Sequence, residues 1–302
     1  MIMSIRSIFD IEYAPCKGKK TGERTLMFEI LKRCKRKDFL FLFDAGFYSF
    51  PIANFIIENG LNFIMKVAKS LKLKAIPGSH MPDGSYLSVV KNKIVKSVNP
   101  KNGRKKWKEI EIIVRVIEFS IPGFRPVRLI TSLLDSAITA KEIVIHYHKR
   151  WDIEIAYDEI KTHQCSTLKG QMPTILRSKR SDLVEQELYA VLITYNLIRL
   201  LMKESTDKEG GNPLFLSFLD TMQIIIECAP HISIANSAKK KIALAYMIGV
   251  IAKSMIDRPR RPRCSPRVVK IKMSNFKRKR KADISKFRNF EEDIKIVYQK
   301  TA

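Results

Sequence analysis

The run from Phe39 to Phe43 and the acid that follows it, Asp44, constrain the fold more than any other stretch of the sequence. Five consecutive apolar residues are typical of a strand that is buried on both faces, as in the centre of a mixed or parallel sheet. Burying an ionised carboxylate is costly unless a partner pairs with it or coordinates it. The sequence therefore predicts a buried strand over 39–43, with a compensating partner at Asp44.

The composition indicates a globular protein that binds polyanions. The chain has 302 residues, 45% of them apolar, which suffices for one large domain or two smaller ones. It carries 56 Lys and Arg against 30 Asp and Glu, a net charge of +26, with a pI near 9.9. Such a surface favours nucleic acid as partner, with an acidic membrane surface as the alternative.

The termini and cysteines narrow the cellular setting. The start of the chain lacks the apolar segment of a signal peptide, and no apolar run is long enough for a membrane span. The five cysteines are scattered and form no CxxC pair, which favours a reducing cytosol and gives no support to a zinc site. We predict a cytoplasmic, nucleic-acid-associated protein that does not bind membranes.

The first half of the chain predicts a strand-rich region. Residues 4–13 have strand-like content, helical spacing begins at Gly22, and Ser49 is placed to cap a helix that ends near Gly60. Between 61 and 134, β-branched runs and turn signals predict a meander of antiparallel strands. Residues 66–108 hold twelve Lys and Arg but one acid, Asp83. We interpret this as a sheet that faces a polyanion; a charged surface that only aids solubility is the alternative.

From Thr139 the pattern becomes helical. Thr139 and Glu142 have the spacing of a capping box, and the helix is expected to continue through His163. A second long helix is predicted from Arg180, a break at 210–213, and further helix to 256. Residues 258–281 contain twelve basic residues and no acid, which predicts a flexible cationic tail.

Four residues of the first predicted helix form a chemically suggestive stripe: Tyr147, Arg150, Glu154 and Lys161. At about 100° per residue, an uninterrupted α-helix would place all four within an arc of roughly 60°. The two cations and the phenol suit phosphate oxygens, whereas the carboxylate would need a divalent cation between itself and a phosphate. The alternative is a set of ordinary surface charges with weak i,i+4 pairing.

These residues resemble a known family. The spacing Tyr147-x2-Arg150-x3-Glu154-x6-Lys161 is similar to the signature of the insertion-sequence-four family of bacterial DDE transposases, and FLFDAGFYS resembles that family's second catalytic motif. The resemblance implies an α/β, RNase H-like catalytic fold, incomplete at its N-terminal strand. It divides the chain into a partial core (1–60), a basic β-strand insertion (61–134), core helices (135–206), and a helical region with a basic tail (207–302).

The resemblance also implies roles for individual residues. Asp44 and Glu154 would be catalytic carboxylates that bind Mg²⁺, with Mn²⁺ as an alternative, in a two-metal site for phosphoryl transfer. A metal ion, rather than Lys or Arg, would then be the partner that compensates Asp44. Tyr147, Arg150 and Lys161 would hold phosphates of the transposon end. Trp107 is a candidate to stack on a flipped base, and a tryptophan in the strand core is the equal alternative.

The implied partners are double-stranded DNA and a second copy of the chain. Transposases of this family work as homodimers in a synaptic complex that holds two transposon ends. We expect this chain to associate with the bacterial nucleoid. Their reaction cuts and joins transposon-end DNA.

The sequence departs from the family pattern in one respect. No Asp-Gly-Thr-like strand carries a first catalytic acid, and only Asp10 lies in a strand-like setting that offers a substitute. We therefore expect an N-terminally truncated, catalytically incomplete copy that neither cuts nor joins DNA alone. One alternative is a non-catalytic DNA-binding protein that regulates an intact transposase through mixed dimers. Another is a basic structural protein of ribosomes or nucleoids.

Overall fold

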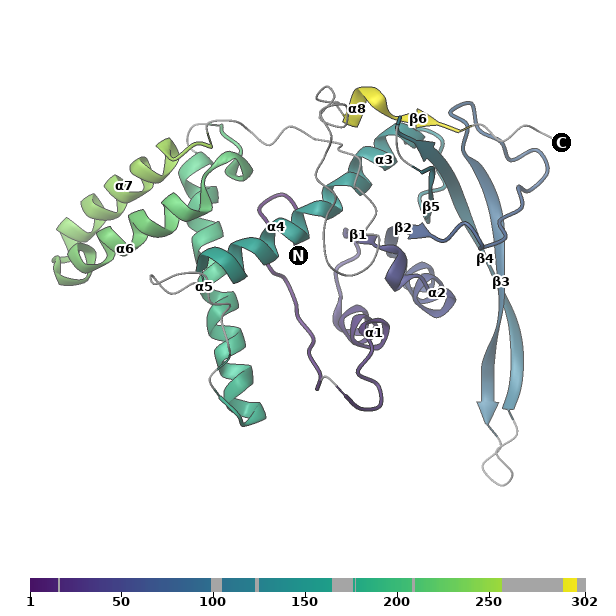
Figure 1. The fold of residues 1–302 in the computed structure, drawn as a ribbon, viewed down its shortest axis with the longest axis horizontal. Helices are drawn as coiled ribbons and strands as arrows, with labels where there is room; N and C mark the ends of the chain where they lie inside the picture. The colour runs from purple at the N-terminus through teal and green to yellow at the C-terminus, as the bar shows by residue number, and fades with distance from the viewer. Residues whose placement is uncertain are drawn as a thin grey trace, which may run out of the picture. The chain divides into compact units, whose positions relative to one another are not determined.

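The computed structural model describes residues 1–15, 17–98, 105–122, 125–164, 176, 178–207, 210–256 and 290–297 (Figure 1). The chain divides into two compact units. The sheet unit comprises residues 12–150 and 262–302, and the helical unit comprises residues 1–11 and 151–261. The predicted cationic tail at 258–281 lies outside the described residues.

The sheet unit is built on one mixed sheet of six strands. Its strands are β1 (Leu40–Phe43), β2 (Asn62–Val67), β3 (Tyr86–Val98), β4 (Lys105–Ser120), β5 (Val127–Thr131) and β6 (Lys295–Ile296). The strand order is β1-β2-β5-β4-β3, and β6 pairs with the end of β4. Only the β1–β2 pairing is parallel among the described strands. The predicted antiparallel meander is confirmed for β3, β4 and β5.

Strand β1 is confirmed, but its predicted burial on both faces is wrong. Among the described residues it pairs with β2 alone and so forms an edge of the sheet. Leu40 at its start is 36% exposed, and burial increases along the strand to Phe43, which is 4% exposed. An apolar run shows that a strand favours burial, but its position in the sheet depends on strands far away in the sequence.

Helices cover both faces of the sheet and divide its core in two. On one face α1 (Glu23–Arg33) and α2 (Phe50–Glu58) pack against apolar side chains that include Phe63 and Met65 of β2. On the other face α3 (Ala140–His148) packs against Ile64 and neighbouring strands. Strand β2 thus sends alternate side chains into both clusters, as the two-residue period of a strand requires.

Local capping fixes where these helices begin. The Ser49 side chain accepts a hydrogen bond from the Ile52 backbone N–H, and Pro51 lies in the first turn of α2. Thr139 and Glu142 form the predicted capping box at α3. These two predictions are confirmed, since each depends on residues within three positions of one another.

The predicted strand at 4–13 does not form. Residues 2–7 make a tight turn closed by a bridge between Ile2 and Ser7, and residues 8–13 are irregular. Asp10, the proposed substitute for a first catalytic acid, accepts a hydrogen bond from the Ile11 backbone N–H. Its strand-like setting in the sequence is therefore wrong.

The helical unit contains the segments that follow Arg150. They are α4 (Asp152–Asp158), the π-helix η3 (Glu159–Gln164), α5 (Ser181–Asp207), the 3-10 turn η4 (Pro213–Phe215), α6 (Phe218–Ile234) and α7 (Ser237–Lys253). Their core gathers around Tyr195, Ile198 and Met202 of α5. The long helix predicted from Arg180 and the break after it are confirmed.

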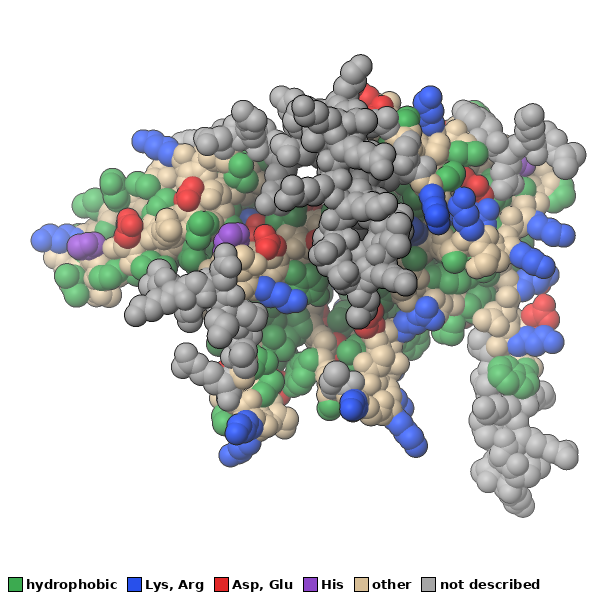
Figure 2. Space-filling view, in the orientation of Figure 1, with side chains coloured by type: hydrophobic (Ala, Val, Ile, Leu, Met, Phe, Trp, Pro, Cys, Tyr) green, Lys and Arg blue, Asp and Glu red, His purple; other side chains and the backbone are tan. Residues whose placement is uncertain are grey.

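Apolar side chains also remain on the outside of the helical unit. Ile226 and Ile234 of α6, and Ile242 and Tyr246 of α7, are each more than half exposed. Figure 2 shows hydrophobic side chains over these two helices. Within the described residues, no helix has both the length and the apolar character that crossing a membrane requires.

Candidate catalytic and DNA-binding site

Asp44 stands where β1 ends and caps the 3-10 turn η1 (Ala45–Phe47). Its Oδ1 accepts a hydrogen bond of 2.7 Å from the Ala45 backbone N–H. Its Oδ2 lies 3.8 Å from Nη1 of Arg150. The Asp44 side chain is 47% exposed, so the expectation of a deeply buried carboxylate is wrong. Because β1 is at the edge of the sheet, Asp44 at its end is partly open to solvent. The guanidinium of Arg150 lies within ion-pairing distance of its carboxylate.

Tyr147 lies in the last turn of α3, next to this ion pair. It is 8% exposed and packs in the apolar cluster under α3. The guanidinium carbon of Arg150 lies 6.0 Å from the centre of its ring. The structure therefore brings three of the predicted site residues together in the sheet unit: Asp44, Tyr147 and Arg150.

The hydroxyl group of Tyr147 is an exception to the usual pairing of buried polar atoms. It is buried, and although Arg150 can donate to its oxygen, no acceptor for its proton lies within hydrogen-bonding distance among the described residues. Burial raises the pKa of Tyr147, Arg150 acts against this shift, and Asp44 adds to it. The phenol is thus a protonated hydrogen-bond donor at neutral pH, beside a guanidinium group and without an acceptor.

A buried arginine holds the start of α3, and sequence reasoning missed it. Arg115 of β4 is fully buried and donates to the side chains of Ser85 and Asp83 and to the backbone carbonyls of Asp135 and Ile138. Asp83 in turn accepts a 2.7 Å hydrogen bond from the backbone N–H of Ala140, the first residue of α3. The only signal in the sequence was a lone arginine inside an apolar strand.

Electrostatics support this anchor at α3. Partial burial by itself raises the pKa of Asp83, but the hydrogen bonds from Ser85 and Ala140 and the charge of Arg115 outweigh it and lower the pKa below its ordinary value. The carboxylate is therefore ionised over the whole neutral range. Asp83 was noted as the one acid in a basic segment, and the structure shows that it serves the fold.

Glu154 and Lys161 belong to the helical unit. Glu154 lies on α4 and Lys161 on the π-helix η3, and both side chains are exposed. The Lys161 ammonium lies 5.3 Å from the ring centre of Tyr157. Exposure at these two positions is what a role in binding an external ligand requires.

The helix that was predicted to continue through His163 changes its winding twice. A 3-10 turn, η2 (Lys149–Trp151), follows α3, and the π-helix η3 follows α4. A 3-10 turn has about 3.0 residues and an α-helical turn about 3.6, while π-helical bonds span i to i+5. The arc calculated for one uninterrupted α-helix therefore does not apply to these four residues.

Trp107 lies on the long hairpin of β3 and β4. Its register partner is Val95, and its side chain is 55% exposed. The alternative of a tryptophan in the strand core is therefore wrong. Its role toward a flipped base stays a prediction.

The hairpin shows how its charges are arranged. Lys91 is hydrogen-bonded to Glu111 opposite it, and Lys93 lies opposite Glu109. Directly opposed residues of paired strands share a face, so each of these two lysines lies beside a glutamate, and Figure 2 shows both blue and red side chains on this part of the hairpin. The basic segment 66–108 contains a single acid, but these two glutamates follow directly after it. On this part of the sheet, the fold balances a charge that the sequence presents as unbalanced.

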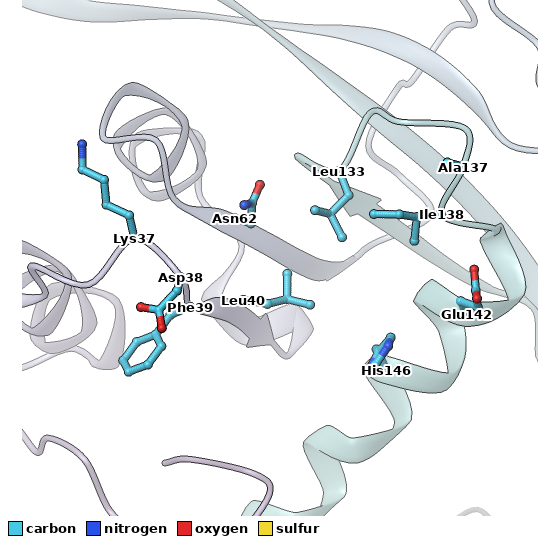
Figure 3. Close-up of a pocket in the computed structure, with 10 residues that line it drawn as sticks. All are labelled: Lys37, Asp38, Phe39, Leu40, Asn62, Leu133, Ala137, Ile138, Glu142 and His146. Carbon is cyan, nitrogen blue, oxygen red and sulfur yellow. The ribbon is translucent and has the colours of Figure 1, made fainter.

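One open depression lies near the start of β1, away from Asp44 at its end. Leu40, Leu133 and Ile138 form its apolar wall, with Glu142 and His146 of α3 beside them (Figure 3). None of the predicted site residues lines it.

The donor set can be compared with the needs of a divalent metal. Carboxylate oxygens are the ligands that Mg²⁺ prefers, and one or two of them plus substrate phosphates are its usual set. Asp44 and Glu154 fit in kind. In the parts of the chain that the structure describes, no three His, Cys, Asp or Glu side chains gather as a metal site. Each of the two units thus contributes one carboxylate of the kind that Mg²⁺ prefers.

Comparisons with known proteins agree with the motifs. The family model described as "Transposase DDE domain" matches residues 11–197, which include all six predicted site residues. The chain is 30% identical over 239 residues to the transposase InsG of insertion sequence element IS4 from Escherichia coli (strain K12). This match covers 76% of the chain and 50% of that relative, so the chain spans about half the relative's length. The chain belongs to the IS4 family of DDE transposases.

Proposed function

We propose that the chain binds the ends of a mobile DNA element and supplies two of the carboxylates for cutting and joining them. Asp44 and Glu154 would hold Mg²⁺, or Mn²⁺ in its place, within an RNase H-like fold. Tyr147, Arg150 and Lys161 would hold DNA phosphates. Double-stranded DNA is the proposed partner, and a pair of chains would bring two ends together.

The unpaired hydroxyl of Tyr147 is the observation that carries this proposal. A buried donor without an acceptor is unfavourable in a folded protein, and it points to a group that the described residues do not supply. With the Arg150 guanidinium beside it, the missing acceptor has the chemistry of an anion. A phosphate oxygen would accept from the phenol while the guanidinium fork binds the same group.

The role of Arg150 follows from its two neighbours. Its guanidinium lies between a carboxylate and a phenol, and its side chain is only 14% exposed. A planar, partly desolvated guanidinium is suited to orient a phosphate. It would also draw the phosphate close to Asp44, which by itself would repel it. A divalent cation bound at Asp44 and Glu154 would supply charge neutralisation at the reacting phosphate.

The proposal distinguishes binding from cleavage. Because the sequence motifs supply two candidate catalytic carboxylates, Asp44 and Glu154, and not a third, we expect the chain alone to bind end DNA without cutting it. This favours a second candidate function, in which the chain regulates an intact transposase by sharing its DNA or joining it in mixed dimers.

The test of binding is the variant Tyr147→Phe, which removes only the hydroxyl group. Because the proton of that hydroxyl has no acceptor among the described residues, we expect the melting temperature to change little while affinity for a fluorescein-labelled transposon-end duplex falls. Tyr189→Phe, at an exposed tyrosine of α5, is the matched control. Unchanged binding by Tyr147→Phe would contradict the phosphate role.

The double variant Arg150→Ala/Lys161→Ala tests the two cations together. We expect it to lose most end-DNA binding at physiological salt and to flatten the salt dependence by about two units of slope. Unaltered binding by this variant would disprove the phosphate contacts. Metal-dependent cleavage by the chain alone, abolished by Glu154→Ala, would instead show a complete active site.

A further inference from the structure

The helical unit contains a buried network of four charged side chains. Glu159 of η3 lies between Arg6 and Arg199, with side-chain exposures of 9%, 9% and 1%. Its Oε1 lies 3.3 Å from Nη1 of Arg6, and its Oε2 is ion-paired with Arg199. Asp152 of α4 completes the network, since its Oδ1 lies 3.0 Å from Nη2 of Arg6. Two acids and two arginines are thus paired with little exposure to solvent.

Tyr195 closes the network on the side of α5. Its hydroxyl donates to Oε2 of Glu159 over 2.9 Å and accepts from Nε of Arg199 over 3.3 Å. Tyr195 is fully buried. Glu159 therefore accepts from three side chains that come from two separate segments of the chain.

The segment that contributes Arg6 is fixed by its own contacts. Arg6 has a backbone φ of 52°, a left-handed conformation that a non-glycine residue adopts only when its surroundings impose it. Next to it, the Asn196 side chain of α5 accepts from the Ile8 backbone N–H and donates to the Ile8 carbonyl. Residues 6–8 thus join α4, η3 and α5.

The network lies on the opposite side of its helix from the proposed DNA-binding residues. Along α4, Glu154 is two residues after Asp152 and so points about 200° away from it. Asp152 and Glu159 are largely or fully buried, whereas Glu154 and Lys161 are exposed. A rotation of this short helix would move both exposed residues together.

The winding of the helix explains why it needs such a network. Segment α4 has only seven residues and continues as a π-helix of six, a form that is rarely stable and often marks functional sites. Tertiary contacts must therefore hold it in place. Glu159, which is buried on this π-helix, provides three of them, to Arg6, Tyr195 and Arg199.

We propose that Glu159, held between Arg6 and Arg199, is a positioning residue that fixes Glu154 and Lys161 toward DNA, with residues 1–11 as a brace. This rests on the proposed phosphate role of Lys161. Glu159 touches no DNA itself, so its effect must pass through the exposed face of the helix.

The test measures how end-DNA affinity depends on salt, with EDTA present, for the full chain and a fluorescein-labelled duplex of the transposon end. We expect Lys161→Ala to lower the slope by about one unit, because one phosphate contact is lost. Glu159→Gln should produce a similar loss. Combining the two should add little, since both remove the same contact.

Asp158→Asn is the matched control. Asp158 is adjacent in sequence, its side chain is 54% exposed, and its neutralisation changes the net charge by the same amount. It should keep the slope of the unmodified chain. Active protein is counted by stoichiometric titration, so a purely structural loss would reduce the active fraction and leave the slope unchanged.

The outcomes separate the two proposals. A normal slope for Glu159→Gln, with a lowered slope for Lys161→Ala, would overturn the positioning role and leave the phosphate role intact. A normal slope for Lys161→Ala would overturn the phosphate role on which the positioning role rests.

If Glu159→Gln does not fold, the variant Arg6→Lys tests the positioning role in its place. It keeps the charge but loses the fork that bridges Asp152 and Glu159, so its slope should also fall. A slope equal to that of the unmodified chain would overturn the brace.

Discussion

The two units hold the residues proposed to bind metal and DNA in different ways. In the sheet unit, Asp44 follows a strand and Tyr147 ends a helix, and two apolar clusters lie behind them. In the helical unit, Glu154 and Lys161 lie on a short helix whose buried side is held by charges. Apolar packing tolerates small changes, whereas a buried ion pair is strongly destabilised when one partner is removed. The two halves of the proposed site should therefore respond differently to mutation.

The largest expected effect is in the helical unit. Arg199→Ala leaves the buried carboxylate of Glu159 without its main partner, and we expect the free energy of unfolding to fall by about 3–5 kcal/mol. Urea denaturation followed by circular dichroism measures it. A loss below about 1 kcal/mol would show that the charges contribute little, and the contrast between the units would disappear.

The matching change in the sheet unit is Ile143→Ala. Ile143 lies on the buried side of α3 and is fully buried, so truncating its side chain leaves a cavity with an expected loss of about 2–4 kcal/mol. The same urea titration reports it, and Lys141→Ala on the exposed side of α3 is the control. A loss as small as the control's would mean that apolar packing does not hold this helix.

Acidification should weaken the anchor of α3. The folded-state pKa of Asp83 is depressed, so its contribution is fully present above the unfolded pKa, near 4, and is lost as the pH falls through the lower folded pKa. We expect about 1 kcal/mol less stability at the acid end, because the carboxylate is partly exposed. Asp83→Asn should remove this component from the pH profile. An identical profile for that variant would assign the acid sensitivity to other carboxylates.

The smallest stability effect should come from replacing the charges altogether. In Glu159→Met/Arg199→Met/Tyr195→Phe, apolar side chains of similar size fill the site, and Arg6 keeps Asp152. Such replacements are often neutral, so we expect a change within about 1 kcal/mol. Thermal unfolding measures it. If stability survives while the salt slope of DNA binding falls, the network serves position more than stability.

The sequence predicted the local features of this fold well. The strand at 40–43, the Ser49 cap, the capping box at Thr139 and the long helix from 181 each depend on residues a few positions apart. The predicted strand at 4–13 does not form. Its Ile8 packs against the core of the helical unit instead.

The candidate site was predicted in part. Two motifs pointed to five candidate residues and the basic insertion to Trp107, and the structure brings Asp44, Tyr147 and Arg150 together. The partners that support them were not visible. Arg115 contacts Asp83 from 32 residues away, and Glu159 contacts Arg6 from 153. No local pattern encodes such pairs.

By itself, the sequence determined the periodic elements, the caps and the family, since these depend on nearby residues and fixed spacings. The tertiary structure alone decided that β1 is an edge strand among the described residues, that Asp44 is half exposed beside an arginine, and that Lys91 and Lys93 of the hairpin lie opposite glutamates. It also decided which acids are buried. The physical reason is that burial and ion pairing depend on which distant segments meet, and the free energy of a charge depends on those neighbours.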